Sequence, residues 1–131
     1  MAPEEKPIEP NAEQLQEICA IAGQYQNFQC VDCSQAIQDY LITQGIGGQR
    51  IELYTGDSIG RDSYIYDDSI GGDAISTNGY HAGIAILIQN QEIVFDNHHP
   101  DGLEREQWLA NLMFPSRFYS DRPFQITETP F

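Results

Sequence analysis

The chain has 131 residues, 40% of them hydrophobic, which is enough for one folded domain and argues against general disorder. Its formal net charge is −14, with 20 acidic and 6 basic residues, so a nucleic-acid partner is not expected. No run of residues approaches the roughly 18 apolar positions of a membrane span, so we expect neither a membrane partner nor a signal peptide.

Residues 1–10 hold three prolines and three glutamates, a composition that predicts a flexible lead. Residues 11–131 are then expected to form the single domain. Asn11 and Gln14 match a capping box, in which two side chains satisfy free N–H groups at a helix start. They predict a first helix that ends near Gly23.

A second helix is predicted to follow Cys30. Apolar residues recur at helical spacing, at Cys33, Ile37 and Leu41, and the pattern stops at Gly45. Both cysteines lie in the first turn, where unpaired N–H groups and the positive end of the helix dipole favour a thiolate. The thiolate is the attacking form of cysteine, so this pattern makes both residues candidate nucleophiles. Cys33 also fits the buried stripe of the helix as an inert core thiol.

A β-sheet is predicted after the second helix, with a first strand over residues 50–54. Residues 55–79 are rich in Gly, Asp and Ser, and only residues 64–66 resemble a strand. So long an irregular stretch in a compact domain is usually functional or mobile. We expect it to form either a cleft wall or lid, or a solvated and variable loop.

Two apolar runs, residues 84–88 and 93–95, predict a β-hairpin. If two residues form its turn, His81 and Asp96 lie on the same face of the sheet, and the carboxylate can orient the imidazole. A shift of one residue would place them on opposite faces. Asn97, directly after Asp96, is the alternative orienting group.

The C-terminal part is predicted to add a helix and a strand. A turn is expected at residues 100–102, followed by a helix over residues 103–112. Trp108 is expected at the edge of this helix, in the core or on the cleft rim, rather than as a specific ligand contact. Residues 124–127 are expected to form an edge strand.

Taken in chain order, these segments supply a thiol, an imidazole and a carboxylate, the set that a papain-like cysteine enzyme needs. We expect His81 to take the proton from the thiol while Asp96 holds the imidazole in its useful tautomer. The oxyanion would be met by the backbone N–H of Cys30, with the side-chain amide of Gln24 or Gln29 as a second donor. No cofactor is required by this chemistry.

Residues 28–34, 76–81 and 94–100, with the glycine-rich turn after the second helix, resemble papain-fold toxin domains. Such domains occur at the ends of bacterial polymorphic toxins and as small stand-alone proteins, and the likeness covers roughly residues 25–112. The resemblance implies an α+β, papain-like fold with an N-terminal catalytic helix packed on a small antiparallel β-sheet. It also implies a peptidase, a protein-glutamine deamidase, a transglutaminase-like enzyme or a related amide-cleaving toxin that acts on a protein or peptide substrate.

The same resemblance implies an immunity protein as a partner, and a location in the cytoplasm or delivery into a target cell. Cys30, with Ser34 four residues on, is similar to the nucleophile of transglutaminase-like and papain-like enzymes. The Asp-Cys-Ser around Cys33 is similar to papain-like cell-wall endopeptidases, but that pattern expects glycine where this chain has Gln35. We therefore favour Cys30. Gln24 precedes it by the interval at which papain places its oxyanion glutamine.

Two other functions compete with a thiol enzyme. The Cys30-x-x-Cys33 pair is the pair used by zinc sites and thiol oxidoreductases, but a zinc site needs two more ligands. His98 and His99 are adjacent rather than spaced as ligands, and we expect them to be solvated turn residues. Cys19, in the first helix, is expected to be a residue of the hydrophobic core. The second competitor is an inactive domain that only binds a partner protein.

Overall fold

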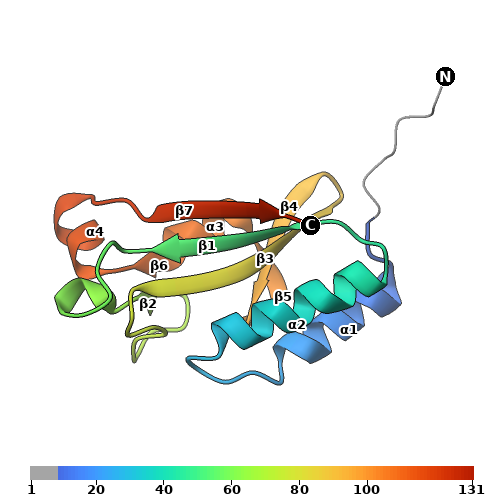
Figure 1. Cartoon of the computed structure of the whole chain (residues 1–131), viewed down its shortest axis with the longest axis horizontal. Helices are drawn as coiled ribbons and strands as arrows, with labels where there is room; N and C mark the ends of the chain where they lie inside the picture. Colours follow the sequence, from blue (N-terminus) through green and yellow to red (C-terminus); the bar gives the residue numbers. More distant parts are fainter. Residues whose placement is uncertain (1–8) are drawn as a thin grey trace.

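The computed structural model describes residues 9–131 (Figure 1). Helix α1 (Ala12–Ala22) begins at Asn11, whose side-chain oxygen accepts a hydrogen bond from the backbone N–H of Gln14 at 2.8 Å. The side chain of Gln14 accepts one from the backbone N–H of Asn11 in return, at 2.9 Å. The predicted capping box is therefore confirmed. Of the predicted lead, residues 1–8 lie outside the described residues.

Helix α2 (Cys30–Thr43) confirms the predicted second helix, and the chain leaves it through Gly45 in the left-handed region, at φ +72°. Its side chains Cys33, Ile37 and Leu41 are fully buried. Helices α1 and α2 lie side by side and pack together on the sheet (Figure 1). The apolar stripe read from the sequence is thus the surface that α2 buries.

The main sheet has five strands in the order β5-β4-β3-β1-β7, and each neighbouring pair is antiparallel. These strands are β1 (Gln49–Tyr54), β3 (Tyr80–Ile88), β4 (Gln91–Asp96), β5 (His99–Glu104) and β7 (Gln125–Pro130). A two-stranded sheet pairs β2 (Tyr66–Asp67) with β6 (Leu112–Met113). Strand β7 confirms the predicted edge strand and extends three residues further.

The β3–β4 hairpin has the two-residue turn on which the sequence argument depended. Ile88 pairs with Gln91, and the turn residues Gln89 and Asn90 have φ values of +52° and +65°. Two successive left-handed residues make a type I′ turn, whose twist matches that of the flanking strands. The predicted register is confirmed.

The segment after β4 differs from the prediction. Residues 100–102 belong to strand β5 instead of a turn, and the following helix is only α3 (Arg105–Asn111). Gly102 has φ +81°, and a Cβ there would lie 2.8 Å from ring atoms of Phe95. The Pro-Asp-Gly sequence therefore lets an irregular strand pass close beneath an aromatic ring, rather than reverse the chain.

The central strands of the sheet bury both faces, whereas the edge strand β7 is exposed along its length. On β3 and β4, Ile84 and Phe95 pack with the α1 and α2 side chains, whereas Ala85 and Val94 pack with Trp108 on the other face. Alternate residues along a strand point to opposite faces, so one strand serves both parts of the core. This explains why the predicted strands are continuously apolar rather than alternating.

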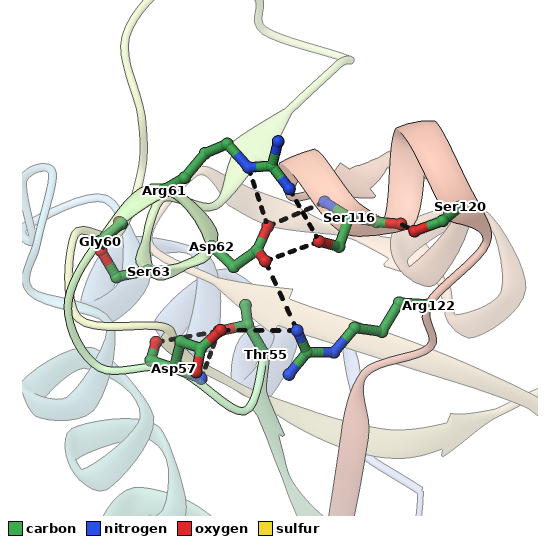
Figure 2. A network of polar contacts seen from close by, with 9 residues as sticks. All are labelled: Thr55, Asp57, Gly60, Arg61, Asp62, Ser63, Ser116, Ser120 and Arg122. Carbon is green, nitrogen blue, oxygen red and sulfur yellow. Dashed lines mark hydrogen bonds and ion pairs between the residues drawn. The ribbon is translucent and has the colours of Figure 1, made fainter.

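The segment after β1 is fixed to α4 (Pro115–Ser120) by a polar network (Figure 2). Asp62 accepts hydrogen bonds from the backbone N–H and the hydroxyl of Ser116, at 2.9 and 2.6 Å. Arg122 reaches both Asp62 and Asp57, at 3.4 and 3.5 Å. The first part of the irregular stretch is therefore tied to the body of the protein through the short helix η1 (Arg61–Ser63), which contains Asp62.

Candidate active site

His81 and Asp96 meet inside the protein. His81 lies near the start of β3 and Asp96 at the end of β4, and neither side chain is exposed. Nε2 of the imidazole lies 2.9 Å from Oδ2 of the carboxylate. Because Nε2 is taken, Nδ1 is the ring nitrogen that remains for another group. Nδ1 is buried and has no hydrogen-bond partner among residues 9–131.

Asp96 accepts four hydrogen bonds. Oδ2 receives the imidazole of His81 and the indole N–H of Trp108 at 2.8 Å. Oδ1 receives the backbone N–H groups of His98 and His99, at 2.9 and 2.8 Å. All four acceptor positions of the carboxylate are thus used. Burial raises the pKa of Asp96, but the hydrogen bond and charge of His81 outweigh it and hold that pKa well below its usual range.

Cys30 is the first residue of α2, and its side chain is 6% exposed. Burial raises the pKa of the thiol, but the nearby imidazole of His81, helped by the backbone of Ala82, lowers it below its usual value. Burial lowers the pKa of His81, whereas Asp96 and Cys30 raise it, to about 10. At neutral pH these shifts favour a thiolate–imidazolium pair.

The pKa values of the other two thiols are shifted in the opposite direction, which favours the protonated form. Burial, followed by the negative charges of Asp96 and Cys30, raises the pKa of Cys33 to about 12. Cys19 is half-buried, so the expectation that it lies in the core is wrong: it faces Asp101, and burial and that carboxylate raise its pKa. Cys30 is therefore the cysteine whose environment favours the reactive form.

The two glutamines proposed as oxyanion donors are exposed. The side-chain oxygen of Gln29 accepts a hydrogen bond from the backbone N–H of Gln26 at 2.7 Å, which folds it back on the preceding turn. Their role as donors stays a prediction. The backbone N–H of Cys30 belongs to the first turn of α2, where no helical acceptor exists for it.

Asn97, the alternative orienting group, points elsewhere. Its Nδ2 donates to the backbone carbonyl of Gln26 at 2.7 Å, while Asp96 occupies the position beside His81. Asn97 thus ties the loop that precedes α2 to the turn that follows β4. It links the segment that carries the thiol to the strand that carries the carboxylate.

His98 and His99 are half-buried, so the expectation that both are solvated is wrong. Nε2 of His98 lies 3.0 Å from Oδ1 of Asn27, and Nε2 of His99 lies 2.7 Å from Oδ2 of Asp67. The physical reason is Asp96, which draws both backbone N–H groups inward and turns the side chains against neighbouring loops.

A groove of about 120 Å³ opens beside the thiol. One wall comes from the start of α2 and the residues before it, and the other from the end of the irregular stretch. Its lining residues are Phe28, Cys30, Val31, Ile75, Ser76, Thr77, Asn78 and Tyr80. The predicted cleft wall is therefore found at residues 75–78, whereas residues 68–73 are exposed, as a solvated loop would be.

Comparison with models of protein families matches residues 13–113 to the family described as papain fold toxin 2. The chain belongs to the papain fold toxin 2 family. The match runs from α1 to β6 and so includes every candidate site residue named above. No curated protein and no solved structure matches the chain.

Membership of the papain fold toxin 2 family agrees with the architecture. The domain is α+β, with the helix that carries Cys30 packed on an antiparallel sheet. The family also gives the coarse functional class, a toxin of the papain-like cysteine-enzyme type.

Sequence reasoning missed one residue of this papain-fold site, Trp108. It was expected at the edge of a helix, in the core or on the cleft rim, but not as a contact of the site. It is fully buried, donates to Asp96, and its ring centre lies 5.8 Å from that of His81. Gly83 was the available signal. A Cβ there would lie 2.9 Å from Cζ2 of Trp108, and a glycine inside an apolar strand indicates that a large group approaches closely.

Within residues 9–131 of this papain-fold toxin domain, no group of three or more His, Cys, Asp and Glu side chains is arranged to hold a metal ion. The Cys30-x-x-Cys33 pair thus lacks additional metal ligands in the described part of the chain. In that same part, no helix combines the length and the apolar character needed to cross a membrane.

Proposed function

We propose that this domain is a cysteine-dependent amide-cleaving enzyme with Cys30 as nucleophile, His81 as general base and acid, and Asp96 as the group that orients the imidazole. The observation that carries the proposal is the buried His81–Asp96 hydrogen bond, together with the lowered pKa of the thiol beside it. A strongly shifted thiol next to an oriented imidazole, at the edge of a groove, is typical of a nucleophile.

The reaction starts from the thiolate–imidazolium pair. Sγ of Cys30 attacks the carbonyl carbon of an amide, forming the C–S bond, and the oxyanion is met by the backbone N–H of Cys30. Nδ1–H of His81 then gives its proton to the leaving nitrogen as the C–N bond breaks, which leaves a thioester. Neutral His81 next takes a proton from water, whose oxygen attacks the thioester, and the acid product leaves as the thiolate and imidazolium return.

Asp96 determines which ring nitrogen of His81 transfers the proton. Because Oδ2 holds Nε2–H, the proton that moves is confined to Nδ1, the nitrogen left free for the thiol. Peptide hydrolysis and glutamine deamidation share this thioester, so the proposal covers both reactions. We propose that the substrate is a protein. We also propose that the producing cell makes an immunity protein that binds this domain, because the family is one of toxins.

Site-resolved alkylation tests the proposal. Native protein would be treated with iodoacetamide at about pH 6, and peptide mass spectrometry would follow Cys19, Cys30 and Cys33 separately. We expect Cys30 to react at least about tenfold faster than the other two cysteines, which serve as internal controls. His81→Ala should remove that advantage. Equal, slow labelling of all three cysteines, unchanged by His81→Ala, would refute the enzyme and favour a binding module.

A cellular test links the thiol to toxicity. Expression of the wild-type domain in a bacterial cytosol should arrest growth, whereas Cys30→Ala and His81→Ala should not. Cys33→Ala is the matched control, because it removes a thiol of the same helix that stays protonated. Growth arrest by Cys30→Ala would rule out Cys30 as the nucleophile.

A further inference from the structure

Phe28 has an unusual backbone. Its φ is +70°, in the left-handed region that glycine and asparagine adopt readily and that bulky residues rarely do. Such a conformation costs on the order of 1–3 kcal/mol and persists only where the surrounding structure holds it. Residues in this state cluster at active sites and ligand clamps.

Hydrogen bonds hold Phe28 from both sides. The backbone N–H of Gln29 donates to the carbonyl of Gln26 at 3.2 Å, and the side chain of Gln29 accepts from the N–H of Gln26. Between them, Nδ2 of Asn27 donates to the carbonyl of Ala74 at 3.0 Å. The turn is thus fixed by its neighbours, and glycine would fit it with less strain than phenylalanine.

Core packing does not explain the aromatic ring either, because Phe28 is 60% exposed. Its side chain lines the groove that contains Cys30, directly before the helix that carries the thiol. Val31, in the first turn of α2, is 47% exposed and lines the same groove. Neither conformational preference nor burial accounts for a phenylalanine here, whereas contact with a substrate does.

The opposite wall of the groove offers polar contacts. Oδ1 of Asn78 accepts hydrogen bonds from the hydroxyl of Ser76 at 2.8 Å and from the backbone N–H of Tyr80 at 3.2 Å. With its oxygen held in this way, the amide N–H groups of Asn78 are left for a substrate carbonyl. The groove is small, about 120 Å³, which suits a single side chain.

We propose that Phe28 is a specificity-determining residue, which selects protein substrates that carry a bulky apolar side chain next to the attacked carbonyl. The inference rests on the proposed function, because it takes Cys30 as the attacking group. Phe28 and Val31 form the apolar side against which that side chain packs, and Asn78 meets the polar backbone of the same segment.

Two chloromethyl ketone probes test the groove. Each is a short blocked peptide, with leucine next to the ketone in one and glycine in the other, and the thiolate of Cys30 displaces chloride from the methylene carbon. In wild type the leucine probe should react at least about tenfold faster than the glycine probe. In Phe28→Gly that preference should fall below about threefold, and in Phe28→Leu it should largely return.

Iodoacetamide, which is too small to use the groove, separates this inference from the proposed function. Phe28→Gly should leave its rate at Cys30 within about twofold, and urea unfolding should show unchanged or increased stability because the strain is relieved. Phe118→Ala is the matched control, since Phe118 is 70% exposed and lies outside the groove. Selective iodoacetamide labelling without a leucine preference in wild type, or with an equal preference in Phe28→Gly, would overturn only this inference. If iodoacetamide does not label Cys30 selectively in wild type, the proposed function itself would be overturned.

Discussion

Asp96→Asn is the most informative single substitution, because it keeps the shape of the side chain and removes half of its acceptor capacity. The carboxylate receives two donors on each oxygen. If the new amide nitrogen replaces Oδ1, it faces the two backbone N–H groups of His98 and His99. If it replaces Oδ2, it faces the indole N–H of Trp108 and the imidazole. In either orientation an N–H group is left facing another N–H group.

The second orientation is less costly, because His81 can adapt by losing its proton from Nε2. Trp108 cannot adapt, and a buried donor left unsatisfied costs about 1–3 kcal/mol. Loss of one partner of a buried ion pair raises the expected total to about 2–5 kcal/mol. The remaining proton of His81 then sits on Nδ1 of a neutral ring, which no longer accepts the proton of Cys30.

Urea unfolding at pH 7, followed by the fluorescence of Trp108, the single tryptophan, measures this loss. Iodoacetamide labelling of Cys30 should slow in the same variant. Asp73→Asn is the control, because it removes the same charge from an exposed position. An Asp96→Asn protein within about 1 kcal/mol of wild type would show that the four hydrogen bonds are not the constraint we describe.

Three further predictions follow from the same site. Gly83→Ala should destabilise the fold by about 1–3 kcal/mol and slow Cys30 labelling, because its methyl group displaces Trp108; unchanged urea unfolding would contradict this. Cys33→Ala should cost roughly 1 kcal/mol by urea unfolding yet leave Cys30 labelling unchanged, and a loss of labelling would move the nucleophile. The raised pKa of His81 stabilises the fold below about pH 6.5 and loses that effect toward pH 10, while the lowered pKa of Cys30 acts in the opposite sense up to about pH 8.5. Below about pH 8.5 the two effects oppose each other, so the stability of Cys30→Ala should fall more steeply with rising pH than that of wild type, and parallel curves would refute the coupling.

The parts that the sequence predicted well are those set by local patterns. The capping box at Asn11 and the stripe from Cys33 to Leu41 each identify a helix from residues a few positions apart. The β3–β4 hairpin followed in the same way, because a two-residue turn fixes the register of every later pair. That register brings His81 and Asp96 together even though 15 positions separate them.

The parts that failed depend on contacts that local patterns do not contain. Pro-Asp-Gly usually marks a turn, but Gly102 is placed where the ring of Phe95 needs space, so tertiary packing overrides the turn preference. The contact of Trp108 with Asp96 was missed for a related reason. Its burial depends on Gly83, from a strand earlier in the chain, and on a carboxylate that needs a second donor.

The acidic surface and the reactive thiol act over different distances. A net charge of −14 disfavours a thiolate in principle, yet surface charges are largely screened beyond about 8 Å at physiological ionic strength. The His81 imidazolium is fully buried near the thiol, so salt weakens its effect on the pKa of Cys30 much less. Local geometry therefore controls the ionisation of Cys30, while the overall charge has little effect on it.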